Sequence, residues 1–179
     1  MKFAAIVIFS VLGVTSVFSG SVQAQSTDLE SEAVSKASAT SYALPIGVTL
    51  VQLNRYFKPR GTKRLSHLNL PQNWGQLGWR HEGTLGFIST TPFAASHPIY
   101  SCFVAGQEDF FTSLDVNCEG HQPFSGGHLV GYVSSVPVEG ALPIYRCRIE
   151  WRKAHMDSFD PHCYGEVGSN NDGLIGYVF

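Results

Sequence analysis

The amino-acid sequence repeats itself with a period of about 45 residues. The clearest mark is a short apolar run with an inner glycine, which occurs three times, at 83–88, 128–133 and 173–178. A second mark, of the form Pro-Ile-Tyr-X-Cys, begins at Pro98 and again at Pro143. A period of this length indicates one structural unit repeated along the chain, with the units burying their apolar faces against one another.

The repeated units favour strands over helices. Their apolar runs are short, rich in β-branched and aromatic residues, and separated by Gly, Pro, Asn and Asp, which is the pattern of strands joined by turns. A propeller normally has at least about four blades, so three units fit a trefoil better. We therefore predict an all-β domain over 45–179, folded as a β-trefoil from three four-stranded repeats at about 45–90, 91–135 and 136–179.

The N-terminal residues have the composition of a targeting segment. Lys2 precedes an almost wholly apolar run at 3–18, and the tripeptide Val-Gln-Ala at 22–24 has the small residues that a signal peptidase recognises. The run is short for a membrane anchor, which needs roughly 20 apolar residues. We predict a signal peptide at 1–24, and hence a secreted, extracellular protein with no membrane span.

The stretch at 25–44 is rich in Ser, Ala and Glu and poor in large apolar side chains. It is predicted to be a flexible leader, although a short helix over 27–38 is an alternative. The whole chain has a formal net charge of −2, whereas a nucleic-acid-binding domain is usually rich in clustered Lys and Arg. We expect a monomer whose partner is an extracellular glycan or protein, with no nucleic acid and no membrane among its partners.

The four cysteines lie in the second and third repeats, with the same spacing in each. Sequence alone permits three connectivities, and the simplest joins Cys102 to Cys118 and Cys147 to Cys163. Secretion favours their oxidation. A thiol nucleophile or a zinc site is disfavoured, because there is no Cys-X-X-Cys motif and an even, paired set leaves no free thiol. We predict two intra-repeat disulfides.

Over about 45–179, and most clearly in its second and third repeats, the chain resembles a widespread secreted repeat family of uncharacterised function. Its units contain Pro-Leu-Tyr-Arg-Cys, Asp-His-Phe, Thr-Asp-Pro, Cys-Glu-Gly and Glu-Gly-Leu-Leu-Gly-Tyr-Val in this order. The matching stretches are 109–113, 118–120, 144–147, 154–163 and 172–178. The resemblance implies a β-trefoil-like accessory or binding module, and it supplies no catalytic residues. The chain departs from the pattern at Ala154, where the family has Asp, and at Tyr164, where it has Glu.

One position of the repeat carries Asn69, Asp115 and Asp160. A short acidic or amide side chain there can bond its own backbone to start a turn, or it can accept hydrogen bonds from sugar hydroxyls beside an aromatic ring. We predict a shallow carbohydrate-binding surface, with residues drawn from Asp115, Glu119, His155, Asp160 and Trp79.

A dense group of metal-ligand side chains also occurs in the third repeat, at His155, Asp157, Asp160 and His162. The equivalent residues of the second repeat are different, and a catalytic zinc site needs three well-placed ligands. We therefore predict no metal and no cofactor. The inner glycines are predicted to mark β-bulges.

The sequence contains no G-x-S-x-G elbow, no H-E-x-x-H helix, no P-loop and no dinucleotide-binding fingerprint. We predict an extracellular binding module, not an enzyme, with lectin-like carbohydrate recognition. The alternative is a secreted protein-directed inhibitor or effector that uses one of the two basic clusters, and a small hydrolase is the least favoured choice. The clusters are Lys58, Arg60, Lys63 and Arg64 in one, and Arg146, Arg148, Arg152 and Lys153 in the other.

Overall fold

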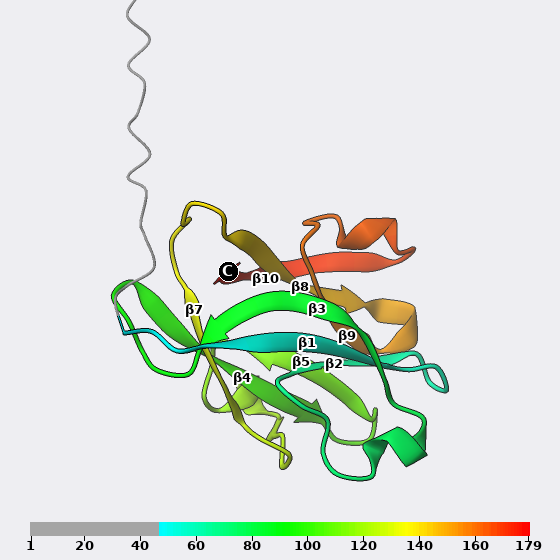
Figure 1. The fold of residues 1–179 in the computed structure, drawn as a ribbon. Coiled ribbons are helices and arrows are strands. Elements are labelled where there is room, and N and C mark those ends of the chain that lie inside the picture. The colour runs from blue at the N-terminus through cyan, green and yellow to red at the C-terminus, as the bar shows by residue number, and fades with distance from the viewer. Residues whose placement is uncertain (1–46) are drawn as a thin grey trace, which may run out of the picture. The chain divides into compact units, whose positions relative to one another are not determined.

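The computed structural model describes residues 47–179. These residues form ten β-strands and four short 3₁₀ helices, and they contain no α-helix (Figure 1). The prediction of an all-β domain is confirmed. No helix in this part of the chain is long and apolar enough to cross a membrane. The predicted signal peptide at 1–24 and leader at 25–44 lie outside the described residues.

The first segment, residues 47–90, forms a three-stranded antiparallel sheet. Its strands are β1 (Leu50–Lys58), β2 (Lys63–His67) and β3 (Arg80–Ser89). β1 pairs with both of the others and therefore lies at the centre. A 3₁₀ helix, η1 (Trp74–Leu77), connects β2 to β3.

The second segment, 91–135, and the third, 136–179, follow the same order of pairing. The first strand of each, β4 or β8, pairs antiparallel with the next strand, β5 or β9, and with the last, β7 or β10. Each segment has three main strands, and the second segment also has the two-residue β6, which pairs with β4. The β-trefoil prediction requires four strands in each segment, so the trefoil stays a prediction. The bounds are β4 (Ser96–Val104), β5 (Asp109–Ser113), η2 (Cys118–Gly120), β6 (Gln122–Pro123), β7 (Leu129–Ser134), β8 (Leu142–Ile149), η3 (Glu150–Arg152), β9 (Ala154–Ser158), η4 (Cys163–Gly165) and β10 (Ser169–Val178).

The last strands of the three segments meet one another. β7 pairs with both β3 and β10, and Phe87 of β3 exchanges backbone hydrogen bonds of 2.7 and 3.0 Å with Phe179. Burying one aliphatic side chain contributes roughly 1.5–3 kcal/mol, so a core shared by all three segments is a strong reason for them to stay together. That core contains Leu53, Leu85, Ile88, Ile99, Val130, Val133, Ile144, Ile175 and Val178.

The middle strands β2, β5 and β9 also contact one another. Each contributes one buried polar residue to their meeting point, namely Ser66, Thr112 and Asp157. The hydroxyls of Ser66 and Thr112 both hydrogen-bond to the Asp157 carboxylate, which is 3% exposed. Burial raises the pKa of Asp157 above its ordinary value, and the two hydroxyl hydrogen bonds only partly oppose this effect.

Both expected disulfides are present, Cys102–Cys118 and Cys147–Cys163. Each joins the central strand of its segment to the 3₁₀ helix after the middle strand, and a closed loop of this size contributes roughly 3 kcal/mol in the chain-entropy argument. The first segment has Tyr56 at the equivalent position. Its ring packs in a cluster with Leu65, Trp79, Phe110 and Phe124, so an aromatic cluster occupies the place of a third disulfide.

The inner glycine of β10, Gly176, lies where the strand is crowded. Its φ is +150°, and the register of β10 against β8 shifts beside it, as in a β-bulge. An added Cβ would lie 2.5 Å from Cγ2 of Val133 and 2.8 Å from the carbonyl oxygen of Ser134. This geometry supports the structural interpretation of the repeated glycines.

We predict that Gly176→Ala lowers the free energy of unfolding by about 2–4 kcal/mol, because alanine is disfavoured at this φ and its methyl group overpacks the contact with β7. Urea unfolding followed by circular dichroism measures the change. Gly75→Ala is the matched control, since nothing lies within 4 Å of its Cβ, and we expect a change within about 0.5 kcal/mol. Equal stability of the two variants would contradict the crowding argument.

Candidate binding site

An open pocket of about 380 Å³ lies between the second and third segments. Its walls come from β4, β5, the turn between them and η2 on one side, and from β8, η3, β9 and β10 on the other. The lining residues are Val104, Gln107, Phe111, Glu119, His121, Arg146, Arg148, Glu150, Lys153, His155 and Asp172. Two of the predicted site residues, Glu119 and His155, are thus brought together from different segments. We call this the Glu119 pocket.

The turn after β5 fixes the position of Glu119. The backbone of Glu119 is left-handed, with φ 54°, and its N–H donates to the Asp115 carboxylate at 3.0 Å. The same carboxylate accepts the N–H of Asn117 at 2.9 Å. These two backbone hydrogen bonds are the main reason that the pKa of Asp115 lies below its ordinary value. Asp115 therefore holds the turn that presents Glu119, and it lines an adjoining hollow of about 200 Å³.

Arg146 on β8 joins the two carboxylates of the Glu119 pocket. Its Nε donates to Asp172 at 2.7 Å, and its two Nη atoms donate to the two carboxylate oxygens of Glu119. The guanidinium also donates to the carbonyl of Thr112 at 3.2 Å and lies 5.3 Å from the centre of the Phe111 ring. Every polar edge of this side chain is engaged, so the two carboxylates are held in a fixed relative orientation.

The ionisation of this pair follows from its surroundings. Partial burial would raise the pKa of Glu119, but the hydrogen bonds from Arg146 and Ser113 outweigh it and hold that pKa below its ordinary value. Burial likewise opposes the charge on Arg146, and the hydrogen bond with Glu119 and the attraction of Asp172 raise its pKa. Glu119 is therefore an ionised hydrogen-bond acceptor and not a proton donor.

His155 is oriented by a buried carboxylate. Asp109, which is fully buried, accepts hydrogen bonds from the backbone N–H of His155 at 3.1 Å and from its Nδ1 at 2.6 Å. A carboxylate only accepts hydrogen bonds, so the hydrogen of the imidazole is assigned to Nδ1. The Nε2 then faces the pocket, 4.0 Å from a carboxylate oxygen of Asp172.

The structure places the other two predicted site residues elsewhere. Asp160 accepts the N–H groups of His162 and Tyr164 at 2.8 and 3.0 Å, so it forms the same turn as Asp115, on another face of the third segment. Trp79 was predicted to offer its ring to a sugar at the surface, and this prediction is wrong. Trp79, which lies between η1 and β3, is 6% exposed, because its ring packs against Trp74 and Phe110.

Sequence reasoning named Arg146 only as a member of a basic cluster, and it did not single out Asp172 or Asp109 as site residues. A signal for the first two was present, since Arg146 directly precedes the first cysteine of the third repeat and Asp172 directly precedes the Gly-Leu-Ile-Gly run. Asp109 opens the 109–113 stretch of the repeat, but its partner could not be inferred from that stretch, because it depends on the contact between β5 and the neighbouring β9.

The structure does not bring together the possible metal ligands of the third repeat, namely His155, Asp157, Asp160 and His162. Asp157 points into the buried contact of the middle strands, and the Asp160 carboxylate accepts the backbone hydrogen bonds of its own turn. Within residues 47–179, the single group of three potential ligand atoms close enough for a metal is Cys102, Cys118 and His128. Both of these sulfurs belong to one disulfide and are not thiolates, which are the form of cysteine that binds a metal.

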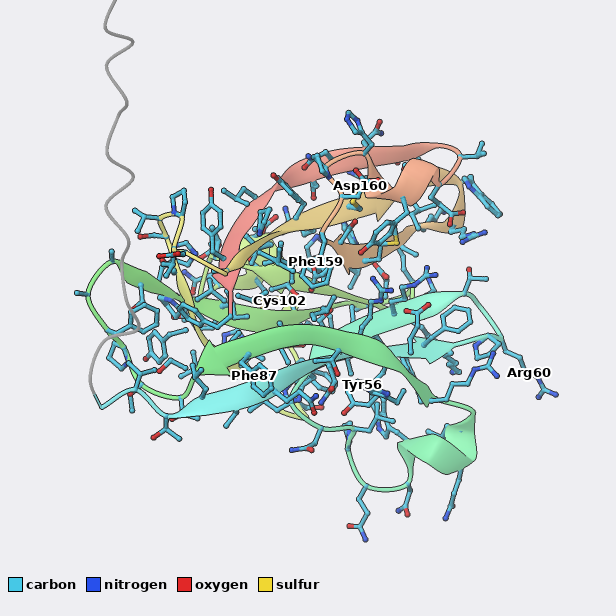
Figure 2. All side chains as sticks on the ribbon, turned by 45° about the horizontal axis from the view of Figure 1, so that its top comes forward. Tyr56, Arg60, Phe87, Cys102, Phe159 and Asp160 are labelled. Atoms are coloured by element: carbon cyan, nitrogen blue, oxygen red, sulfur yellow. A yellow bond between two sulfur atoms is a disulfide. The ribbon has the colours of Figure 1, made fainter. Side chains whose placement is uncertain are left out.

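Most of the charges in the two basic clusters have partners. Lys63 is buried, and its Nζ donates to the carbonyl oxygens of Arg152 and Lys153. Arg64 pairs with Glu82, and Arg152 with Glu166. Arg60 stands out from the turn between β1 and β2 (Figure 2). Lys63, Arg64 and Arg152 are thus engaged by other groups of the protein itself.

No protein-family model, curated protein or solved structure matches this chain. The site is therefore interpreted from its own geometry.

Proposed function

We propose that this protein is a secreted, lectin-like module that binds uncharged carbohydrate in the Glu119 pocket. The lining of the pocket carries the proposal. The lining contains three carboxylates and three cationic side chains, so the pocket has no large net charge; these are Glu119, Glu150 and Asp172, and Arg146, Arg148 and Lys153. The apolar side chains that the lining contains, Val104 and Phe111, are 7% and 6% exposed. A ligand that fits this lining is polar and uncharged, with many groups that both donate and accept hydrogen bonds. Sugar hydroxyls have this property.

The size and rigidity of the Glu119 pocket support the same proposal. Its volume of about 380 Å³ falls within the range of roughly 300–1,000 Å³ that is usual for small-molecule sites. Arg146 and Asp109 hold Glu119, Asp172 and His155 in place before a ligand arrives, which reduces the entropy lost on binding.

The proposal includes the finer points of architecture and location. We take the three segments to be copies of one unit, as the recurring strand order and the repeated sequence marks suggest, and we take the resemblance to the secreted repeat family as an indication of the same origin. The two disulfides are compatible with an oxidising, extracellular compartment. The β-trefoil assignment stays part of this proposal.

A glycan array tests the function directly. We expect the purified domain to bind a restricted set of neutral glycans, and Glu119→Ala to lower that signal at least tenfold, because the variant loses both carboxylate oxygens and leaves Arg146 half unpaired. Glu139→Ala, which changes an exposed carboxylate in the loop before β8, is the matched control and should bind like the wild type.

A panel of secreted proteases, assayed in parallel, tests the alternative of a protein-directed inhibitor. Inhibition of a protease together with silence on the array would overturn the carbohydrate proposal in favour of that alternative.

A further inference from the structure

A second face of the protein repeats the framework of the Glu119 pocket. It lies between the third and first segments and consists of Arg55 on β1, Glu82 on β3 and Tyr164 in η4. We call it the Tyr164 surface. Arg55 and Arg146 both directly precede the position of the first disulfide cysteine of the repeat, and Glu82 and Asp172 both directly precede the glycine of the last apolar run.

The contacts of the two arginines match one by one. Arg55 Nε donates to Glu82 at 2.7 Å, as Arg146 Nε donates to Asp172 at the same distance. Arg55 Nη1 donates to the carbonyl oxygen of Asp157 at 2.9 Å, and Asp157 is the counterpart on β9 of Thr112 on β5. The two arginines thus connect neighbouring segments in the same way.

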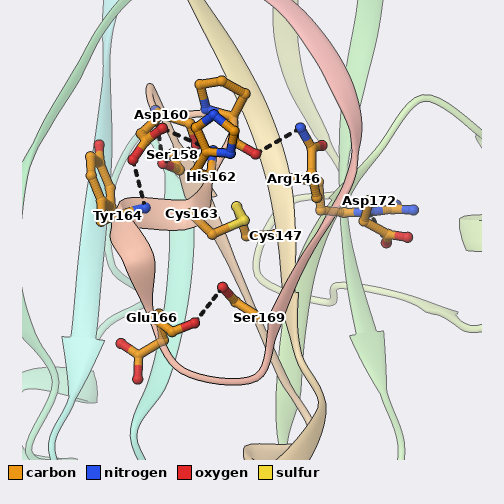
Figure 3. Close-up of a disulfide and its surroundings, with 12 residues drawn as sticks. Arg146, Cys147, Ser158, Asp160, His162, Cys163, Tyr164, Glu166, Ser169 and Asp172 are labelled. Atoms are coloured by element: carbon orange, nitrogen blue, oxygen red, sulfur yellow. Dashed lines mark hydrogen bonds and ion pairs between the residues drawn. A yellow bond between two sulfur atoms is a disulfide. The ribbon is translucent and has the colours of Figure 1, made fainter.

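The turn that carries Tyr164 is also the same. Tyr164 has φ 55°, against 54° for Glu119, and its N–H donates to Asp160 at 3.0 Å, as that of Glu119 donates to Asp115. Figure 3 shows this hydrogen bond beside the Cys147–Cys163 disulfide. The two sites therefore share the arginine, its carboxylate partner and the turn. The phenol ring of Tyr164 takes the place of the Glu119 carboxylate.

The Tyr164 ring is available to a ligand. It is 51% exposed, and its hydroxyl accepts the N–H of Phe159 at 3.1 Å, which fixes the ring on the surface. The Arg55 guanidinium lies 5.8 Å from the ring centre. Next to it is the carboxylate of Glu82, a hydrogen-bond acceptor that Arg55 and Arg64 hold in position.

We infer that the Tyr164 surface is a second carbohydrate-binding site, which stacks a pyranose ring on Tyr164 and accepts its hydroxyls at Glu82. This inference rests on the proposed function, and it adds a second binding site for carbohydrate on the same chain. Tyr164 and Asp172 lie on opposite sides of the Cys147–Cys163 disulfide (Figure 3), so two glycans can bind at the same time.

The third junction, between the first and second segments, lacks the framework. The second segment has Ser101 where the others have arginine, and Gly127 where they have a carboxylate. Ser101 is 1% exposed and Gly127 has no side chain, so this junction provides neither the cation nor the acceptor. The protein is therefore bivalent and not trivalent.

Titration calorimetry tests the inference, with the glycan that gives the strongest array signal used in its soluble form. We expect two glycans per chain for the wild type, one for Glu119→Ala, one for Tyr164→Ala and none for the double variant. On a dense array each single variant should bind at least tenfold more weakly than the wild type, because simultaneous engagement of two sites raises avidity. Tyr164→Phe keeps the ring and should retain binding within about threefold, which separates stacking from a general disturbance of the turn.

The outcomes distinguish the two proposals. One glycan per chain in the wild type, unchanged by Tyr164→Ala, would overturn the second site and leave the Glu119 pocket standing. Loss of all binding in Tyr164→Ala with no effect of Glu119→Ala would support the Tyr164 surface and overturn the pocket. A wild-type protein that binds no glycan on the array would overturn both.

Discussion

Arg146→Ala is expected to weaken glycan binding at the Glu119 pocket about a hundredfold or more, equivalent to roughly 2.7 kcal/mol. The substitution removes the guanidinium that pairs with both Glu119 and Asp172. The two carboxylates would then repel each other and lose their fixed orientation, and the carbonyl of Thr112 would lose its donor. Arg146→Lys should restore only part of the affinity, since an ammonium group does not make the bidentate contact that a guanidinium makes.

The measurement is best made in the Tyr164→Ala background, so that titration calorimetry reports the pocket alone. Arg60→Ala in the same background is the control, because Arg60 is exposed at the tip of the turn between β1 and β2 and should leave the affinity unchanged. Wild-type affinity in the Arg146→Ala variant would show that the ion pairs do not organise the binding site.

Asp157→Ala is expected to lower the free energy of unfolding by about 3 kcal/mol at low pH, where the wild-type carboxyl is protonated. The side chain is buried where β2, β5 and β9 meet, and it is the hydrogen-bond partner of Ser66 and Thr112. Alanine would leave both hydroxyls without this partner and open a cavity, and both effects are costly in a protein interior. Urea unfolding measures the loss, and Glu139→Ala, which changes an exposed carboxylate, should stay within about 0.5 kcal/mol of the wild type.

The raised pKa of Asp157 predicts a specific dependence on pH. Above the ordinary value of 3.8 the unfolded chain loses this proton while the folded protein still holds it. The folded protein then binds more protons than the unfolded chain, so this group's contribution to the free energy of unfolding falls as the pH rises from 3.8 to the folded pKa. Glu119, whose pKa is lowered, has the opposite effect, and it loses its contribution as the pH falls below 4.5.

Comparing wild type with Asp157→Asn isolates the first of these effects, because Glu119 is unchanged in both proteins. The stability of the wild type relative to this variant should decrease as the pH rises above 3.8, the ordinary pKa of the group, as measured by urea unfolding. A difference that is constant above that pH would mean that the carboxyl of Asp157 titrates normally despite its burial.

The parts of the structure that follow from short stretches of sequence were predictable. Two cysteines at one spacing in consecutive repeats led to the correct disulfides, because the two residues of each pair lie within one segment of the chain. Likewise Asp115 and Asp160 form turns by bonding the backbone that follows them, which is a contact over two residues. The alternation of apolar runs and turn residues was enough for the all-β class.

The contacts between segments were not predictable in the same way. Trp79 was named because an aromatic ring beside hydrogen-bond acceptors can pack against a sugar, and only the cluster with Tyr56, Phe110 and Phe124 shows that its ring is buried. The pairing of Asp109 with His155 joins residues of two different segments. Nothing in a single sequence specifies which faces of neighbouring segments meet, so sequence reasoning could name Glu119 and His155 but not the contacts between segments that hold them in place.

The strand order also bears on how the chain reaches its native state. Each central strand pairs with partners that lie within its own segment, and each disulfide closes inside one segment. Contacts between residues that are near in sequence form quickly, because little chain entropy is lost in bringing them together. The sheets can therefore form, and their thiols can be oxidised, before the segments dock. Mispairing of cysteines from different segments then has to compete with a faster local reaction.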